Sequence, residues 1–384
     1  MECTVRAVTR GPKHHFFGYY DKTPWDISGR YLLAGQVDFM DRSPAGGEPL
    51  TIGLVDLQDD CRFSPIARTT AWHWQVGCHV QWLGSDPGRR IIYNDQRAGR
   101  LVSVVRDVFD GSERVLPMPI MAVNRQGTMA ITVDMHRLHA CRPGYGMPGG
   151  GDYALDQLAP ADQGIYTIDL ASGECKRIIN LAQLAAWQPV EDMEGARHWC
   201  NHLVFNPSGT RFSFLHRYKG PRTGNWVTRF FTANVNGSDL FLLNPEKMTS
   251  HYDWRNDGEI LAWARHDGVD AYWLFTDKNR EVRRIGETCF REDGHCNFSP
   301  DGRWMLTDTY PDRNDQKRTL ILYRWSDGPR IDIGRFYSPN PADIERRCDL
   351  HPRWSRDGRQ VCIDSVHEGS RQMYVIDVSG IVNS

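Results

Sequence analysis

The chain has 384 residues, enough for two ordinary domains or for one large repetitive domain. Hydrophobic residues make up 40% and charged residues 24%, with 35 glycines and 21 prolines, which excludes disordered and collagen-like chains and indicates a soluble protein rich in turns. The sequence contains no apolar stretch of membrane-spanning length, and its 46 basic and 48 acidic residues form no long block of one sign, so we expect neither membrane insertion nor nucleic-acid binding.

Ten cysteines are too few for a secreted disulfide scaffold, so we expect reduced thiols. The first residues lack the charged and then apolar pattern of a secretory signal. A cytoplasmic location is therefore expected, or a secreted one if a leader has been trimmed. The sequence gives no indication of the oligomeric state.

A turn motif recurs along the chain, with an aromatic residue four positions before a glycine. Clear copies occupy 25–29, 205–209, 254–258, 298–302 and 354–358, with a weaker copy at 123–127 and a longer one at 82–88. A short apolar run with strand character follows each copy, at 31–34, 90–93, 129–133, 212–215, 260–263, 304–307 and 361–364. Seven such units predict an all-β fold, a seven-bladed β-propeller of four-stranded antiparallel blades. A two-sheet sandwich is the alternative, but it would not repeat one motif seven times.

The two ends of the chain complement each other. Residues 372–378 form the third strand of the last unit, while residues 4–8 precede the first unit without a partner. We therefore expect the N-terminal strand to close the last blade. Residues 1–384 are predicted to form a single propeller domain with an inserted loop at about 134–163 and a short helix at 180–187. A loop of that length is typical of a lid or a binding loop.

Histidine stands three residues before the aromatic residue in five of the seven units. These histidines are His79, His202, His251, His295 and His351. The innermost strand of a blade lines the central channel, so the five side chains should converge at one mouth of it. His139 and Arg217 follow second strands that return to the same face. The alternative is that these histidines are structural and only hydrogen-bond to neighbouring backbone carbonyls.

Cysteine accompanies two of these histidines in neighbouring blades. Cys348 is close in sequence to His351, and His295 is flanked by cysteines, with His251 one blade further round. Thiolate and imidazole are the ligands that zinc prefers. The sequence therefore predicts a divalent metal, zinc before manganese, near His251, His295, Cys348 and His351.

Acid–base chemistry on an acidic sugar is the second hypothesis for this face. Removing the proton next to a uronate carboxylate requires a cation to neutralise the carboxylate, a base near neutral pH and an acid for the leaving oxygen. Histidine, tyrosine and arginine supply these groups. A glycoside hydrolase instead needs two inward carboxylates, for which the sequence offers few candidates.

Several motifs resemble known propeller families. Segments 298–303 and 354–359 resemble TolB-type repeats, and segments 15–22, 142–146, 201–211, 216–217 and 348–354 resemble the seven-bladed oligogalacturonate and ulvan lyases. Likeness to the ulvan lyases implies a catalytic histidine at His79 and an arginine for the substrate carboxylate at Arg217. Their tyrosine at the head of the fourth blade is replaced here by Asn201-His202, so His202, or His139 and Tyr145 from the insertion, would act instead.

Likeness to the oligogalacturonate lyases places a base at His251 and metal ligands at His295 and His351. We therefore expect a lyase that cleaves an acidic oligo- or polysaccharide by β-elimination, with catalytic residues among His79, His139, Tyr145, His202 and Arg217. The alternative is a noncatalytic propeller that binds a glycan or a protein around a structural zinc.

Overall fold

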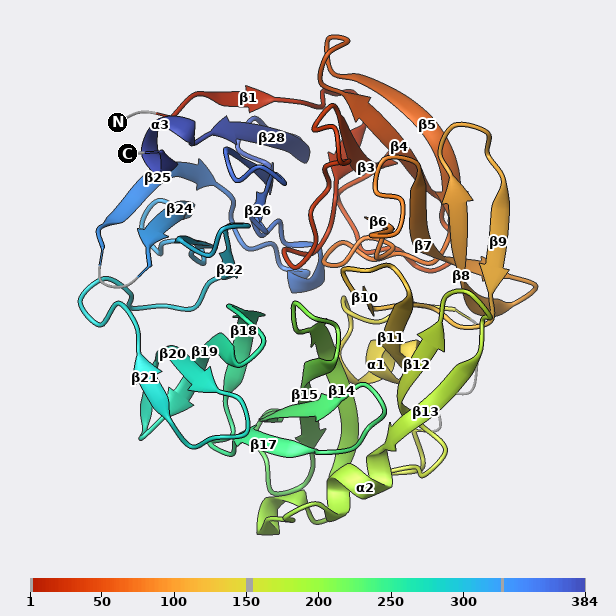
Figure 1. Cartoon of the computed structure of the whole chain (residues 1–384), viewed down its shortest axis with the longest axis vertical. Helices are drawn as coiled ribbons and strands as arrows, with labels where there is room; N and C mark the ends of the chain where they lie inside the picture. Colours follow the sequence, from red (N-terminus) through yellow and green to blue (C-terminus); the bar gives the residue numbers. More distant parts are fainter. Residues whose placement is uncertain (1–2, 150–154, 326–327, 384) are drawn as a thin grey trace.

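Seven four-stranded antiparallel sheets arranged in a ring make up the computed structural model of the chain, which describes residues 3–149, 155–325 and 328–383 (Figure 1). In each sheet one edge strand lies next to the central axis and the opposite edge strand lies at the rim. The predicted seven-bladed β-propeller is therefore confirmed.

The strands follow one another from the axis outward in the first three blades. The first blade contains β2 (His14–Phe16), β3 (Tyr31–Val37), β4 (Leu50–Asp56) and β5 (Arg62–Thr69). The second contains β6 (Gln81–Trp82), β7 (Arg90–Arg97), β8 (Arg100–Asp107) and β9 (Glu113–Leu116), and the third contains β10 (Ala122–Val123), β11 (Met129–Val133), β12 (Gly164–Asp169) and β13 (Cys175–Asn180).

The remaining blades keep the same order. The fourth contains β14 (Arg197–Phe205), β15 (Arg211–Lys219), β16 (Val227–Asn234) and β17 (Phe241–Asn244), and the fifth contains β18 (Thr249–Trp254), β19 (Glu259–His266), β20 (Val269–Thr276) and β21 (Val282–Arg284). The sixth contains β22 (Asn297–Phe298), β23 (Trp304–Asp308), β24 (Lys317–Arg324) and β25 (Arg330–Tyr337), and the seventh contains β26 (Arg353–Trp354), β27 (Gln360–Ser365) and β28 (Gln372–Asp377).

The N-terminal strand completes the seventh blade, as predicted. β1 (Val5–Ala7) pairs antiparallel with β28 as the outermost strand, and the two ends of the chain lie side by side in Figure 1. The segment after β1 then runs to the axis. There the buried pair of Arg353 and Asp364, 2.7 Å apart, holds it: Arg353 donates to the carbonyls of Gly18 and Tyr19, and Asp364 accepts from the N–H groups of Phe17 and Gly18.

The recurring aromatic residue joins neighbouring blades. The indole N–H of Trp254 in the fifth blade donates to the carbonyl of Val204 in the fourth, and that of Trp82 in the second blade donates to the carbonyl of Pro24 in the first. Apolar side chains from both blades surround these contacts, so the hydrophobic core lies between adjacent sheets. The motif glycines Gly302 and Gly358 have φ of 67° and 70°, which a side chain would disfavour.

The described helices are short and lie outside the sheets, in connections between strands or, for α3, after the last strand. Residues 134–163 separate β11 from β12 and include α1 (Met135–Cys141), and the predicted helix after β13 is α2 (Leu181–Ala186), capped by Asn180. The other helical segments are α3 (Ser379–Val382) and the 3₁₀ turns η1 (Glu191–Met193) and η2 (Ile344–Arg346). Within the described ranges, no helix has the length and apolar character needed to cross a membrane.

Candidate active site

Two adjacent tyrosines occupy the axis of the ring and gather four of the five predicted histidines around them. The rings of His202 and His351 both lie 5.0 Å from that of Tyr19, and the rings of His295 and His251 lie 5.2 Å and 5.7 Å from that of Tyr20. The Tyr20 hydroxyl donates to the Tyr252 carbonyl at 3.1 Å, which fixes its ring. Histidines from four separate blades therefore share one centre.

The heads of the inner strands leave regular β geometry where these histidines stand. The pairing of β14 with β15 shifts register between Asn201 and Val204, around His202, and that of β18 with β19 shifts between Thr249 and Tyr252, around His251. His202 also has a left-handed backbone, with φ of 50°, which is uncommon outside glycine. Such strain concentrates at binding and catalytic sites.

His79 and His139, two predicted catalytic residues, have no ring contact with Tyr19 or Tyr20 among the described residues. His79 is 4% exposed, neither of its ring nitrogens has a hydrogen-bond partner among the described residues, and burial, with the charge of Lys22, lowers its pKa well below the usual value. His139 lies in α1, with its ring 6.1 Å from that of His73. Neither residue lines the cavity described next, and their catalytic roles stay predictions.

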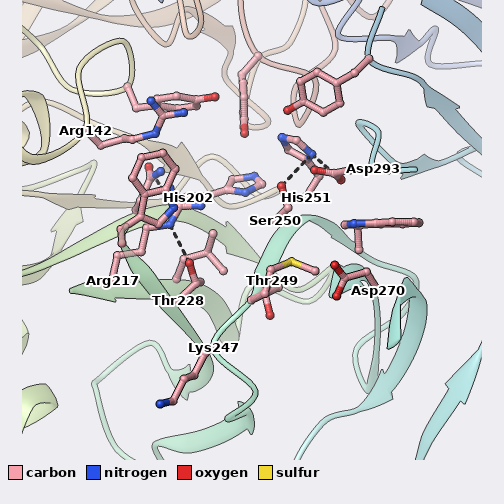
Figure 2. Close-up of a pocket in the computed structure, with 18 residues that line it drawn as sticks. Arg142, His202, Arg217, Thr228, Lys247, Thr249, Ser250, His251, Asp270 and Asp293 are labelled. Atoms are coloured by element: carbon pink, nitrogen blue, oxygen red, sulfur yellow. Dashed lines mark hydrogen bonds and ion pairs between the residues drawn. The ribbon is translucent and has the colours of Figure 1, made fainter. Parts of the chain in front are cut away.

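A polar cavity of about 320 Å³ opens beside the tyrosines (Figure 2). The fourth blade contributes His202 and Arg217, the fifth contributes His251, and the insertion contributes Arg142 and Tyr145. Figure 2 shows Arg142 and Arg217 on one side of the cavity, with His251 and Asp293 on the other. Three of the five predicted catalytic residues, Tyr145, His202 and Arg217, thus line one cavity.

The insertion holds Tyr145 as a fixed part of the cavity wall. Gly146 lies so close to α1 that a Cβ atom there would collide with the Met135 carbonyl oxygen and the His139 backbone nitrogen. The Tyr145 hydroxyl accepts a hydrogen bond of 2.9 Å from Arg347 Nη2, and the Arg142 guanidinium lies 4.6 Å from its ring centre. Burial alone would raise the pKa of Tyr145, but the charges of Arg347 and Arg142 outweigh it and lower that pKa below the usual value.

Arg217 presents a buried positive charge to the cavity. Its side chain is 8% exposed, its Nε donates to Thr228 Oγ1 at 3.3 Å, and it forms no ion pair with any described carboxylate. Burial first, and then the charge of Arg142, lowers the pKa of Arg217 to about 10. It remains charged at neutral pH and can receive an anion.

Two neutral imidazoles also reach this cavity. His251 Nδ1 lies 3.0 Å from Asp293 Oδ1, which orients the ring, and burial keeps the pKa of His251 below its usual value. Burial lowers the pKa of His202 well below its usual value, and a proton on His251 would lower it further. Both rings are therefore able to accept a proton at neutral pH.

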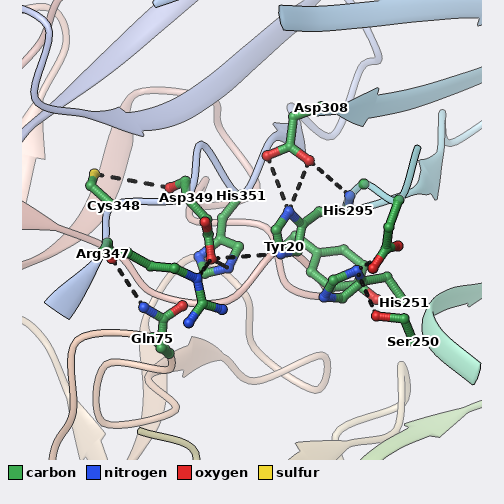
Figure 3. A network of polar contacts seen from close by, with 12 residues as sticks. Tyr20, Gln75, Ser250, His251, His295, Asp308, Arg347, Cys348, Asp349 and His351 are labelled. Carbon is green, nitrogen blue, oxygen red and sulfur yellow. Dashed lines mark hydrogen bonds and ion pairs between the residues drawn. The ribbon is translucent and has the colours of Figure 1, made fainter. Parts of the chain in front are cut away.

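Next to the cavity, His295, Asp349 and His351 form a group whose ligand atoms all lie within 4.8 Å of one another (Figure 3). Asp308 Oδ1 binds His295 Nδ1 at 2.8 Å, which turns His295 Nε2 toward Asp349 Oδ2, 4.0 Å away. His351 Nε2 lies 3.8 Å from the same oxygen. Both Nε2 atoms are buried, and neither has a hydrogen-bond partner within the described part of the chain.

Two arginines keep the central carboxylate of this group charged. Arg347 Nε lies 2.7 Å from Asp349 Oδ2, and Arg318 Nη1 lies 2.8 Å from Oδ1. Burial would raise the pKa of Asp349, but these charges hold it well below the usual range, while burial keeps the pKa of His351 well below its own. Two imidazoles and a carboxylate are donors that suit a divalent cation.

Cys348, a predicted ligand, faces away from this group. Its sulfur lies 4.0 Å from the Asp349 carbonyl oxygen, and burial raises the pKa of the thiol to about 11. The site also contains residues that sequence reasoning did not single out. Arg142 and Asp293 line the cavity, Asp349 belongs to the triad, and Tyr20 and Arg347 contact residues of the triad. Of these, Tyr20, Arg142 and Asp349 lie in segments that carry the likeness to the lyases, which was the available signal.

Fold and site together define a seven-bladed β-propeller with a polar, histidine-lined cavity on its axis. No protein-family model matches the sequence, and a search of curated proteins gave no match. Among solved structures, oligogalacturonate lyase from Vibrio parahaemolyticus is similar over 98% of this chain and 97% of its own, with a TM-score of 0.69 and 13% identity. An oligogalacturonate lyase in complex with manganese is similar over 98% of this chain and 96% of its own, with a TM-score of 0.70 and 15% identity.

The tricorn protease is also similar, over 96% of this chain but 34% of its own, with a TM-score of 0.53 and 10% identity. The likeness to the oligogalacturonate lyases indicated by the sequence motifs is thus confirmed for the fold. At these identities, a shared fold does not fix the reaction.

Proposed function

We propose that the chain is a lyase that cleaves a uronic-acid-containing oligosaccharide by β-elimination. The observation that carries this proposal is that one cavity holds an unpaired guanidinium, Arg217, a phenol, Tyr145, and a neutral imidazole, His251. These three groups match the requirements of the reaction, which are a cation for the carboxylate, an acid and a base. The structural likeness to oligogalacturonate lyases over nearly the whole chain supports the same assignment.

In the proposed step, Arg217 pairs the carboxylate of the sugar and stabilises the negative charge that develops on it. The Nε2 atom of His251 takes the proton from the carbon next to that carboxylate. The electron pair forms a carbon–carbon double bond as the glycosidic carbon–oxygen bond breaks, and the Tyr145 hydroxyl gives its proton to the leaving oxygen. Asp293 stabilises the imidazolium that His251 becomes, and His202 is the alternative base.

A divalent cation held by His295, Asp349 and His351 completes the proposal, because both imidazoles keep a buried nitrogen without a hydrogen bond. When bound, such a cation would withdraw electron density from the substrate carboxylate. Two nitrogen donors and one oxygen donor serve zinc and manganese alike, and the thiol of Cys348, which favoured zinc, lies outside this set.

The test is incubation of the protein with oligouronates while the ultraviolet absorbance of the unsaturated product is followed. We expect the activity to fall about 10²- to 10⁴-fold in Tyr145→Phe and in Arg217→Gln. Arg222→Gln, which changes an arginine on the same hairpin as Trp226, is the control and should keep the parent activity. Binding without any cleavage would overturn the lyase and favour a noncatalytic glycan-binding propeller.

A further inference from the structure

The insertion and the hairpin between β15 and β16 place two guanidinium groups around one indole ring. The Cζ atom of Arg142 lies 4.7 Å from the Trp226 ring centre, and that of Arg217 lies 5.8 Å from it. All three residues line the cavity, and Trp226 is 36% exposed. Cation–π contacts of this kind hold an arginine in place without neutralising its charge.

The other charged groups of the cavity wall already have partners. Lys247 Nζ lies 2.6 Å from Asp192, Asp270 lies 2.7 Å from Arg265, and Asp293 lies 3.0 Å from His251. Within the described residues, neither Arg142 nor Arg217 forms an ion pair, and the buried Nε of Arg142 has no hydrogen-bond partner. Two positive charges in the cavity are therefore left for a ligand.

Holding these two cations together without an anion is unfavourable. The charge of Arg142, together with burial, lowers the pKa of Arg217, which reports their mutual repulsion. A ligand with a single acidic group neutralises one of them and leaves the other in a partly buried position. A ligand with two acidic groups neutralises both, and charged hydrogen bonds to guanidinium groups are the strong ones.

We propose that Arg142 is a specificity-determining residue that binds a second acidic group, on the sugar next to the one whose carboxylate Arg217 holds, with Trp226 positioning both arginines. The ligand is then an oligosaccharide with acidic groups on two neighbouring units. This inference rests on the proposed function for the identity of the ligand as an acidic sugar, and it assigns to Arg142 a role in binding alone.

Calorimetric binding tests the inference in a His251→Gln background, which removes the proposed base and keeps the ligands intact. Three disaccharides are compared: digalacturonate, galacturonate linked to a neutral sugar, and a uronate linked to a sulfated sugar. We expect Arg142→Gln to weaken binding of digalacturonate about 10- to 100-fold and that of the singly charged disaccharide by less than about twofold. A selective loss with the sulfated disaccharide instead would identify the second group as a sulfate.

Two further variants protect the test against a folding defect. Arg142→Lys keeps the charge but lacks the planar fork, so its selectivity should lie between those of the parent and Arg142→Gln. Arg222→Gln, an arginine of the same hairpin that already pairs with Glu191 and Glu194, should leave selectivity unchanged. Equal weakening of all three ligands, or of none, overturns the inference. Selective binding without cleavage in the parent protein would instead contradict the lyase and leave this inference standing.

Discussion

The buried pair of Arg353 and Asp364 should contribute strongly to stability, and Arg353→Met tests how much. The pair lies between β26 and β27, both side chains are almost fully buried, and their atoms approach to 2.7 Å and 3.1 Å. The methionine fills a similar volume but leaves the Asp364 carboxylate without its counter-ion. It also leaves two backbone carbonyls, those of Gly18 and Tyr19, without their donor.

The expected cost follows from these lost partners. Removing one member of a buried ion pair typically costs about 3 to 5 kcal/mol, because the remaining charge is uncompensated. In the double variant Arg353→Met/Asp364→Leu no charge is left, but the N–H groups of Phe17 and Gly18 lose their acceptor, at about 1 to 3 kcal/mol each when buried. The double variant should therefore lose less free energy of unfolding than the two single variants lose together, by at least about 2 kcal/mol.

Urea unfolding of the parent, both single variants and the double variant measures this coupling. Arg303→Met is the matched control, because Arg303 pairs with Asp301 on the surface of the sixth blade and such pairs contribute about 1 kcal/mol or less. Additive single effects, or a loss in Arg353→Met no larger than that in Arg303→Met, would refute the reasoning.

Two other predictions follow from the polar groups of the structure. The purified protein should contain close to one divalent metal ion per chain by elemental analysis, and His351→Ala or prolonged chelation should remove it; metal content unchanged in His351→Ala would contradict the triad His295, Asp349 and His351 as the site. Burial lowers the pKa of His198, which lies 2.9 Å from His216, to about 4, so the unfolded chain gains its proton first and stability is lost as the pH falls from 6.5 toward 4. This group contributes about 3 kcal/mol to that loss. The free energy of unfolding should therefore differ less between pH 7 and pH 4.5 in His198→Gln than in the parent protein. An equal difference in both proteins would exclude His198 as a source of the acid sensitivity.

The blades are predictable from the sequence because the same physical task recurs in each of them. An aromatic residue such as Trp82 or Trp254 donates a hydrogen bond to the preceding blade, and a glycine turns the chain a few residues later. The motif is therefore recognisable in each blade even though the residues between these two positions differ. The closing strand is predictable for a related reason, since an unpaired strand at one end matches a missing strand at the other.

The site was predictable only in part, because its contacts depend on how the ring closes. Histidines at the heads of strands could be located by their spacing from the motif, but only four of them reach Tyr19 and Tyr20, whose segment approaches blades four to seven. His79 lies beyond that contact.

Asp349 shows a limit of a different kind. The sequence favours Cys348 as a soft ligand beside His351. Residues 348–351 precede β26, and His351 has a left-handed φ of 42°, so spacing in the sequence does not show which neighbour faces it. The contact of Arg142 with Trp226 had no sequence signal, because it joins the insertion to a hairpin of another blade.

Because the segment after β1 supplies the axial tyrosines and the seventh blade holds it, residues of the first blade depend on a blade that is synthesised after the other six. A chain with six finished blades still lacks Arg353 and Asp364, which anchor the backbone of Phe17, Gly18 and Tyr19, so the bond of Tyr20 to Tyr252 is left to hold the tyrosines. Ligand recognition should therefore begin only after translation of the last blade, and splitting the gene between blades would disable both fragments until they reassociate.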